Sequence, residues 1–424
     1  MTRAPRRLLG LENTIRPYAW GSPTAIPALL GLEPTGEPAA EMWIGAHPGA
    51  PSRIFAEGTT LMDAVAAEPE RLLGAEAAAR FDRQLPFLLK LLAAESTLSL
   101  QTHPTVEQAR EGHEAEDAEG IAIDAPHRSY QDRNHKPELL CALTEFDALC
   151  GFRPLADSAR FLDRLAAAGA HELAPVRERL LASGGLRDVV TWLLTLPPAG
   201  QAALVEHTVP AVRKVADGAG EWQVEAACIA DLAERYPMDV GVVLAVLLNH
   251  VRLQPGEAIY LAAGQIHAYT KGFGVEIMAN SDNVLRAGLT PKHINVPELL
   301  RTVDFAAAPV PPLVPEEVGE GELAFPVPVE DFALSRLDVS DTAELRLPCA
   351  GPSLVLCVAG ALRVTAGEES IELTPGGSLF AAAGEPIVVR GPGAGFRATT
   401  GRPADDPDGE AHDSEAPDSE DDPS

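Results

Sequence analysis

The sequence predicts a mainly β fold with a helical insertion, made of two β-barrel domains of one type and an α-helical domain. Short apolar runs broken by Gly and Pro, as in residues 11–52 and again from Val251, are typical of strands joined by tight turns. Over residues 155–236 the chain is rich in Ala, Leu, Arg and Glu, with apolar positions at helical spacing. A thirteen-residue plan also occurs twice, which indicates two domains of the same type.

The repeated plan starts at Pro255 and again 120 positions later at Pro375. Both copies have a Pro-Gly turn, an aromatic residue, an Ala-Ala pair and a Gly at the same spacing. The first copy ends on His267, whereas the second has Ile387 at that position. Two barrels, of which only the first carries a ligand at this corner, are the simplest explanation. Chance agreement in a chain rich in Ala and Gly is the alternative.

A chain of 424 residues exceeds one ordinary core, so several domains are expected. Helices are expected within the first barrel at residues 61–81 and 106–119, and the Pro-rich residues 309–315 are expected to link the barrels. The predicted organisation is residues 1–154, first part of the first barrel; 155–236, helical insertion; 237–308, second part of the first barrel; 309–399, second barrel; 400–424, an acidic tail expected to be disordered and to aid solubility.

The charge balance argues against nucleic acid as a partner. The formal net charge is −29, and the ten acids of residues 405–424 leave −19 for the rest of the chain. Binding a phosphate backbone needs clustered positive charge, which neither figure allows. A small anionic substrate stays compatible with this charge, provided that a few cations converge locally.

The chain carries no sequence feature of a membrane or secreted protein. Neither a signal peptide nor a stretch of about 20 apolar residues is present, so we expect no membrane association. The five cysteines are scattered and odd in number, which predicts reduced thiols in a cytoplasmic protein.

Lysine is rare in this sequence, with five among 33 basic residues. Where Arg fills nearly every generic surface role, a remaining Lys can serve as a compact charge or a group that titrates near neutrality. Four of the five, Lys90, Lys136, Lys271 and Lys292, lie in segments that other patterns single out, although chance placement remains open. Lys90 is unusual because it interrupts the apolar run of residues 85–92, which is typical of a strand buried on both faces.

Residues 98–104 alternate apolar and polar side chains, as a half-buried strand does. Gln101 and His103 therefore share one face, and both can reach one metal ion; Pro104 ends the strand. A hydrogen-bonded pair at a strand end is the alternative for an isolated Gln-x-His. Glu138 stands at the threshold of a second apolar run and is either a strand-end carboxylate or a ligand aimed into a cavity.

Four polar residues at strand ends of the first barrel form a candidate metal site: Gln101, His103, Glu138 and His267. Two imidazoles and one carboxylate with an open position are typical of catalytic zinc or iron. Further along the chain, Asp282 and Arg286 stand four residues apart. This spacing fits either a helical ion pair or two opposite charges that line a cleft.

Four segments together resemble the type I phosphomannose isomerases, a cupin family: residues 41–48, 98–104, 135–138, and 264–267 with 280–288. The match runs in order through most of residues 11–300. The resemblance implies one zinc ion per chain, held by Gln101, His103, Glu138 and His267. It also implies two cupin (jelly-roll) barrels, a catalytic one with the helical insertion and a second one without metal. Ala262 replaces a Pro common in the family, and no ligand is lost.

The implied reaction interconverts mannose 6-phosphate and fructose 6-phosphate through a cis-enediol. The candidates for catalytic roles are Arg286, Lys136, Glu276, Asp282 and His135. The candidates for substrate binding are Ser99, Lys90, Lys292 and Trp20, with Lys292, Ser99 and Arg286 placed at the phosphate. The identity of the base is left open, since a desolvated Lys or a carboxylate of raised pKa would suit it.

The expected partner is a phosphosugar substrate, and the chain is expected to be a monomer, with a dimer left open. A non-catalytic cupin that binds a phosphosugar is the second hypothesis, and retention of Lys136, Arg286 and all four ligands argues against it. A non-haem iron cupin oxygenase is the third, and Gln101 as a ligand disfavours it.

Overall fold

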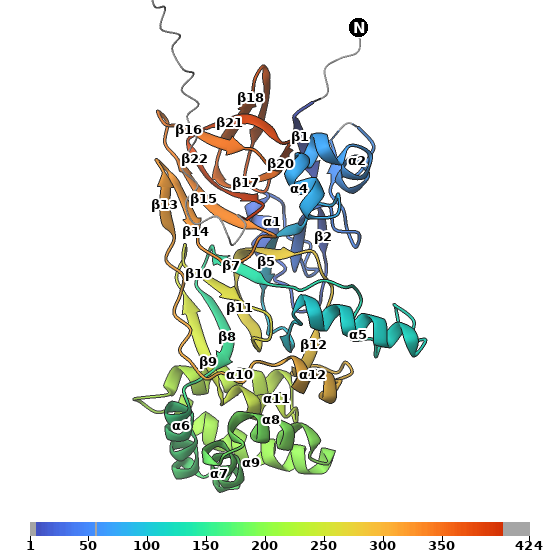
Figure 1. The fold of residues 1–424 in the computed structure, drawn as a ribbon. Coiled ribbons are helices and arrows are strands. Elements are labelled where there is room, and N and C mark those ends of the chain that lie inside the picture. The colour runs from blue at the N-terminus through green and yellow to red at the C-terminus, as the bar shows by residue number, and fades with distance from the viewer. Residues whose placement is uncertain (1–5, 56, 402–424) are drawn as a thin grey trace, which may run out of the picture.

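A computed structural model describes residues 6–55 and 57–401 of the chain. Within these residues the fold is mostly β, with strands in three sheets of ten, eight and four strands. Figure 1 shows the ten-stranded sheet between the helices of residues 155–245, at the bottom, and the strands of the C-terminal part, at the top. No helix in the described ranges is long and apolar enough to cross a membrane.

The ten-stranded sheet is organised around one long strand, β11 (His267–Ala279). Its first half pairs with β6 and β8, its second half pairs with β5 and β7, and the register shifts between Tyr269 and Lys271. The remaining strands of this sheet are β2 (Thr14–Arg16), β3 (Glu41–Gly45), β5 (Phe87–Ala94), β6 (Leu100–Thr102), β7 (Glu138–Ala142), β8 (Phe146–Phe152), β9 (Leu248–Leu253), β10 (Ala258–Leu261) and β12 (Leu285–Gly288). All eight residues of β5 are buried, as its apolar run predicts.

The helical insertion lies between β8 and β9, two strands that pair with each other. Its first helix begins at Leu155, and its last helix lies beyond residue 236. Its elements are α6 (Leu155–Ala168), η1 (His171–Leu173), α7 (Ala174–Leu181), α8 (Gly185–Thr195), α9 (Pro198–Ala216), α10 (Gln223–Arg235) and α11 (Gly241–Ala245). Phe161, Leu162 and Leu165 are buried on one face of α6, because apolar residues three and four apart share a helix face.

The C-terminal strands form the eight-stranded and four-stranded sheets: β13 (Glu316–Gly319), β14 (Glu322–Phe325), β15 (Ala333–Val339), β16 (Glu344–Cys349), β17 (Ser353–Gly360), β18 (Leu362–Ala366), β19 (Glu369–Leu373), β20 (Ser378–Ala381), β21 (Gly384–Arg390) and β22 (Gly393–Thr399). Two N-terminal strands, β1 (Leu8–Glu12) and β4 (Arg53–Ile54), complete the larger sheet. The boundary expected at residue 309 therefore does not separate the strands of the two parts. The Pro-rich segment before β13 also packs on the first part, because the Leu313 amide donates to the Ala258 carbonyl at 2.7 Å.

The sequence repeat has a structural counterpart. β10 begins and ends 120 residues before β20, and the preceding glycines, Gly256 and Gly376, have φ of +92° and +81°. A turn of this kind needs a residue that adopts positive φ without strain. Ile387 is fully buried where the first copy carries His267, so the second copy has an apolar side chain at that corner.

The helix expected at residues 61–81 is three short helices. A proline begins the second and Gly74, with φ +84°, separates it from the third, so the apolar pattern continues while the axis breaks. The helices outside the insertion are α1 (Ala25–Leu29), α2 (Leu61–Ala67), α3 (Pro69–Leu73), α4 (Ala75–Arg80), α5 (Val106–Ala118) and α12 (Val296–Thr302). The helical ion pair considered for Asp282 and Arg286 is wrong, because Arg286 lies on β12. Of the expected tail, residues 402–424 lie outside the described residues.

Candidate metal centre and active site

Strand register brings the candidate residues together. On adjacent antiparallel strands, His267 of β11 stands opposite Gln101 of β6, which in turn stands opposite Arg286 of β12. Directly opposed residues project to the same face with Cβ atoms about 5 Å apart. Glu138 opens β7, whose partner is the second half of β11. His103, just after β6, shares the face of Gln101.

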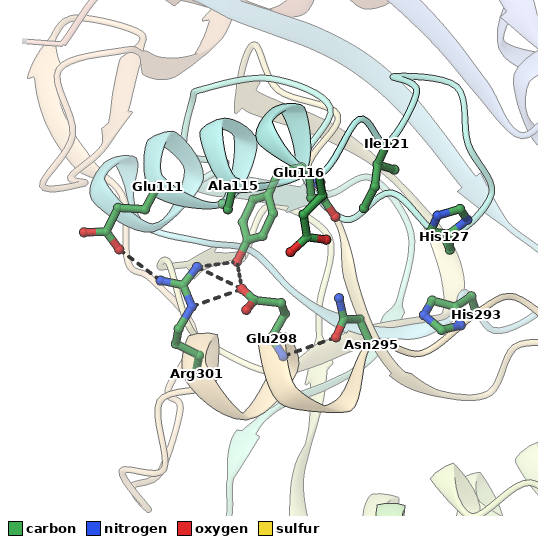
Figure 2. A pocket seen from close by; sticks show the side chains of 12 residues that line it. Glu111, Ala115, Glu116, Ile121, His127, His293, Asn295, Glu298 and Arg301 are labelled. Atoms are coloured by element: carbon green, nitrogen blue, oxygen red, sulfur yellow. Dashed lines mark hydrogen bonds and ion pairs between the residues drawn. The ribbon is translucent and has the colours of Figure 1, made fainter.

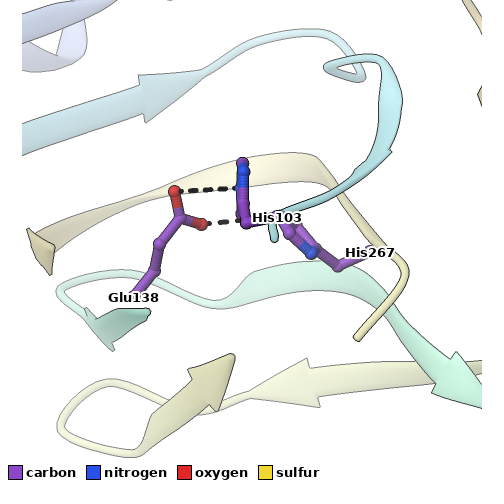
Figure 3. A group of neighbouring side chains, drawn as sticks. All are labelled: His103, Glu138 and His267. Carbon is purple, nitrogen blue, oxygen red and sulfur yellow. Dashed lines mark ion pairs between the residues drawn. The ribbon is translucent and has the colours of Figure 1, made fainter. Parts of the chain in front are cut away.

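Three of the four predicted ligands converge, as Figure 3 shows. Nε2 of His103 lies 3.4 Å from Oε1 of Glu138, and Nε2 of His267 lies 3.4 Å from Oε2 of the same carboxylate. The ligand atoms of all three lie within 4.8 Å of one another, and each residue is at most 2% exposed. Imidazole nitrogens and a carboxylate so arranged form a donor set that suits zinc.

Both histidine rings are oriented by carbonyl groups behind them. Nδ1 of His103 is 2.7 Å from the Asn283 carbonyl, and Nδ1 of His267 is 2.9 Å from the Gln265 carbonyl. Each Nδ1 therefore carries the proton, and each Nε2 turns its lone pair toward Glu138. Burial lowers the pKa of His103 to about 4, which keeps the ring neutral as a ligand must be. In the described residues, Nε2 of His103 is a buried atom without a hydrogen bond. A metal ion fits these residues.

Gln101 lies at the edge of the three ligands. Its amide nitrogen is 3.5 Å from Nε2 of His267, and Oγ of Ser99 donates to its amide oxygen at 3.4 Å. A half-turn of the amide directs its oxygen toward the histidines, since oxygen and nitrogen occupy similar positions in this group.

A second row of polar residues crosses the same sheet. Trp43, Lys90 and Glu276 stand opposite one another on β3, β5 and β11. Nζ of Lys90 is 3.0 Å from Oε2 of Glu276 and 3.7 Å from Oε1 of Glu41. Burial opposes the charge on Lys90, but attraction to Glu276 and Glu41 outweighs it and raises the lysine pKa. The charge of this buried lysine is therefore balanced by two carboxylates.

Glu41 and Trp43 were absent from the candidates. Nε1 of Trp43 donates to Oε2 of Glu41 at 2.6 Å, which fixes the carboxylate beside Lys90. Both belong to the segment 41–48 that carries part of the family resemblance. The available sequence evidence was Glu41 at the start of a mainly apolar run. In the structure this strand is fully buried, and an unpaired buried charge is costly.

Cations surround the metal ligands. Nζ of Lys136 is 3.2 Å from Oε1 of Glu138. Arg286 is half-buried, and its guanidinium makes neither an ion pair nor a hydrogen bond in the part of the chain that the structure describes; burial lowers its pKa. Partial desolvation and the nearby Arg286 lower the pKa of Lys292 as well. Neither cation has a carboxylate partner among the described residues. Two neighbouring cations of this kind are suited to bind an anionic group of a ligand.

Asp282 lies in the segment between β11 and β12, one residue before Asn283, whose carbonyl contacts His103. One of its carboxylate oxygens lies 3.7 Å from Nε2 of the buried His47, and 48% of its side chain is exposed. Both residues line a cavity of about 640 Å³. His47 was also absent from the candidates; burial lowers its pKa, so it faces Asp282 as a neutral ring.

Two candidates make contacts elsewhere. Nε2 of His135 lies 2.8 Å from Oδ2 of Asp331, in the C-terminal part, so this nitrogen is not directed at the metal ligands. Trp20 is half-buried and packs against a core cluster that contains Tyr269, two residues beyond His267. Its ring stacks on that of Tyr18, with the centroids 5.7 Å apart.

A separate cavity of about 410 Å³ lies between α5 and α12 (Figure 2). Several of its polar groups pair with one another or with main chain: the Tyr130 hydroxyl donates to Glu298 at 2.7 Å, Arg301 donates to the same carboxylate, and Glu116 accepts two main-chain N–H groups. These pairs connect the neighbouring segments, which accounts for the paired residues without a bound ligand. The sequence patterns had indicated no site there.

The fold and the site define a mainly β protein with a buried, two-histidine and one-carboxylate metal-binding geometry and flanking cations. Comparison with known proteins agrees. The family "Phosphomannose isomerase type I, catalytic domain" matches residues 8–155, and "Mannose-6-phosphate isomerase, cupin domain" matches residues 321–394. The mannose-6-phosphate isomerase of Escherichia coli strain K12 is 41% identical over 370 residues, which cover 85% of this chain and 90% of that protein.

Solved structures give the same result. A crystal structure of mannose 6-phosphate isomerase bound with zinc and yttrium matches with a TM-score of 0.83 at 37% identity, covering 93% of this chain and all of the other. A mutant phosphomannose isomerase from Salmonella typhimurium matches with a TM-score of 0.84 at the same identity and coverage. The chain therefore belongs to the type I phosphomannose isomerase family. It is an enzyme, with mannose-6-phosphate isomerase activity.

Proposed function

We propose that this chain interconverts D-mannose 6-phosphate and D-fructose 6-phosphate through a cis-enediol, with one zinc ion held by Gln101, His103, Glu138 and His267. The convergence of two oriented Nε2 atoms and a buried carboxylate within 4.8 Å is the observation that carries the proposal. The orphaned Nε2 of His103 supports a ligand at this point. Bound there, zinc would supply Lewis-acid polarisation of the sugar oxygens.

The cations of the chain supply the remaining positive charge. As a proton leaves C2 of the open-chain aldose, negative charge develops on the neighbouring oxygen, and Arg286 and Lys136 stabilise it. Arg286 suits this role because it has no carboxylate partner among the described residues and stands opposite Gln101. Lys292, Ser99 and Arg286 are the proposed contacts of the phosphate, and Lys90 and Trp20 are proposed to bind the sugar.

Asp282 is our choice for the group that takes the proton from C2 and returns it to C1. Its carboxylate is half-exposed and contacts His47 at 3.7 Å. The other candidates are already engaged: Glu276 with Lys90, Lys136 with Glu138, and His135 with Asp331. A half-exposed carboxylate that is not held by a lysine or arginine is free to approach C2 of a bound sugar, which proton transfer requires.

The same proposal includes the architecture. Residues 1–154 and 237–308, apart from strands β1 and β4, would form the catalytic cupin barrel, interrupted by the insertion of residues 155–236. Residues 309–399, together with those two strands, would form a second jelly-roll barrel. The alternation of buried and exposed residues in β16 supports a half-buried barrel strand, and the exact spacing of β10 and β20 supports two barrels of one type.

Removal and return of zinc tests the proposal. We expect purified protein to isomerise mannose 6-phosphate, to lose that activity with a chelator and to regain it with zinc. Folded protein that binds zinc without turning over the sugar would leave a binding role as the better explanation. Turnover that survives complete removal of the metal would refute the role of zinc.

Substitution of Asp282 tests the base. Asp282→Asn is expected to lower kcat by about 10²- to 10⁴-fold, the range typical of general acid–base catalysis, and to leave zinc content unchanged. Exchange of the C2 proton with deuterium from solvent water should fall in parallel. If exchange persists at the normal rate, another group moves the proton, and Glu276→Gln is the next variant.

A further inference from the structure

Two segments far apart in the sequence meet behind the metal ligand His103. The side chain of Asp132 joins them: its Oδ1 accepts the Ser281 hydroxyl at 2.9 Å, and its Oδ2 accepts the Asp282 amide at 2.7 Å. Oδ1 also accepts the amide of Asn134 on its own segment, at 2.9 Å. Both oxygens of one carboxylate are thus used to hold main chain and a hydroxyl, and neither oxygen contacts a metal ligand.

Asn283 completes this connection from the other side. Its side chain is fully buried, and its Oδ1 accepts the main-chain N–H groups of Gln131 at 2.7 Å and Asp132 at 3.2 Å. Its Nδ2 donates to the main-chain carbonyls of Asp132 and Asn134, at 2.9 and 2.8 Å. The amide has four hydrogen-bonding positions, and all four are satisfied. Asn283 therefore has one available orientation relative to residues 131–134.

The main chain of Asn283 contacts the proposed metal site directly. Its carbonyl lies 2.7 Å from Nδ1 of His103 and so sets the tautomer and the tilt of that ring. The preceding residue, Asp282, is held through its amide by Asp132, which fixes the start of its side chain beside His47. One short segment therefore positions a metal ligand and the proposed base together.

We propose that Asp132 is a positioning residue for the metal centre, acting through Asn283 on the ring of His103 and through the main chain on Asp282. The inference rests on the proposed zinc site and goes beyond it, because Asp132 touches neither the ligands nor the substrate cations. The half-buried carboxylate of Asp132 accepts four hydrogen bonds, which orient it strongly. Replacing one of its oxygens therefore shifts the segment of residues 281–283. Displacement of Asn283 then moves Nε2 of His103 away from Glu138 and His267.

Asp132→Asn is the principal test, because it keeps the shape and presents an NH₂ group to one of the donors. We expect apoprotein of this variant to bind zinc about 10- to 100-fold more weakly than wild type in competition with a chelator, as for other residues that orient ligands. With saturating zinc, kcat should fall about tenfold or more while KM for mannose 6-phosphate changes by about twofold or less, since Arg286 is held separately by the pairing of β12 with β6 and Lys292 lies farther along the chain.

Glu369→Gln is the matched control. Glu369 is also half-buried and accepts the main-chain N–H groups of Arg7 and Leu8 from a distant segment, but it lies in the C-terminal sheet. It should lose thermal stability and keep the zinc affinity and kcat of wild type. If Asp132→Asn behaves like this control, Asp132 has only a structural role and the inference is overturned.

Ser281→Ala decides the matter if Asp132→Asn does not fold. It removes one donor to Oδ1 of Asp132 and should weaken zinc binding in the same direction by a smaller factor. Unchanged zinc affinity in a folded Ser281→Ala protein would overturn the inference. Wild-type protein that fails to bind zinc in the same assay would refute the proposed metal site itself, so the two failures are distinguishable.

Discussion

At the scale of single residues, the buried lysine of β5 shows how charge is kept inside this sheet. Lys90 is 5% exposed and faces Glu276, Glu41 and the ring of Trp43, whose centroid is 5.4 Å from Nζ. Two carboxylates that share one ammonium depend on it for their own burial. Removal of the ammonium leaves their charges uncompensated, which costs more than the lost pair itself contributes.

Lys90→Met is therefore expected to lower the free energy of unfolding by about 3–5 kcal/mol at neutral pH. Burial raises the pKa of Glu276 and Lys90 opposes that rise, so the variant carries a carboxyl whose folded-state pKa lies above its unfolded value near 4.5. Such a group favours the folded state fully at low pH and loses that contribution as pH rises. The difference from wild type should thus be smaller at pH 4.5 than at pH 7.5.

Urea unfolding at the two pH values measures this difference. Lys271→Met is the control, because Lys271 lies exposed on β11, and it should change stability by less than about 0.5 kcal/mol. An equal loss in Lys90→Met at both pH values would mean that lost packing, rather than stranded carboxylates, explains the effect.

At the scale of secondary structure, β11 joins the proposed metal ligand His267 to Glu276 across one bend. Gly272 lies in that bend with φ +139°, and a Cβ there would stand 2.4 Å from the ring of Phe146. Both the backbone conformation and the close approach therefore require glycine. The strand can pair with β6 and β8 before the bend and with β5 after it only if this residue has no side chain.

Gly272→Ala is expected to destabilise the protein by about 1–3 kcal/mol or more, since the added methyl overpacks the ring and the φ is unfavourable for alanine. Thermal unfolding of the zinc-free protein measures the loss. Gly319→Ala on the exposed strand β13 has open space around it and should be nearly neutral. Equal effects of the two substitutions would contradict the packing argument.

The sequence predicts those elements that are determined by the pattern of residues within the element itself. The apolar run of residues 85–92 predicts a buried strand, and β5 is found there with all its residues buried, since seven of its eight side chains are apolar. The repeat predicts β10 and β20 because the same turn residues recur in both. The pairing of β1 with β20 is different: Leu8 and Leu9 alone give no period, and their partners lie some 370 residues away.

The same distinction applies to the site. Residue types and short spacings indicate His103, Glu138 and His267 as ligands, and these three converge. The contact of His135 with Asp331, 196 residues away, follows no local pattern. Asn283 acts on His103 through its main-chain carbonyl, which any residue possesses, so no side-chain pattern can indicate it.

At the scale of the whole molecule, the hydrophobic cores cross the boundaries that the sequence suggests. One cluster combines Leu9, Leu89 and Ile277 with Phe380 and Leu354 of the C-terminal strands. Another combines the helices of the insertion with Leu149 and Leu285 of the ten-stranded sheet. A domain that folds alone has a core of its own, so shared cores predict that the parts unfold together.

Leu9→Ala tests this coupling, because Leu9 is 4% exposed on β1 and stands opposite Phe380 of β20. We expect calorimetry of the wild-type protein to give one main unfolding transition. The substitution should cost about 2–5 kcal/mol, as for other large-to-small changes in a core, and should move that transition to lower temperature without dividing it. Leu181→Ala, at a leucine 53% exposed on α7, should shift it very little. A wild-type trace with separate transitions, of which Leu9→Ala moves one alone, would mean that the parts fold as independent domains and that the shared cluster does not couple them.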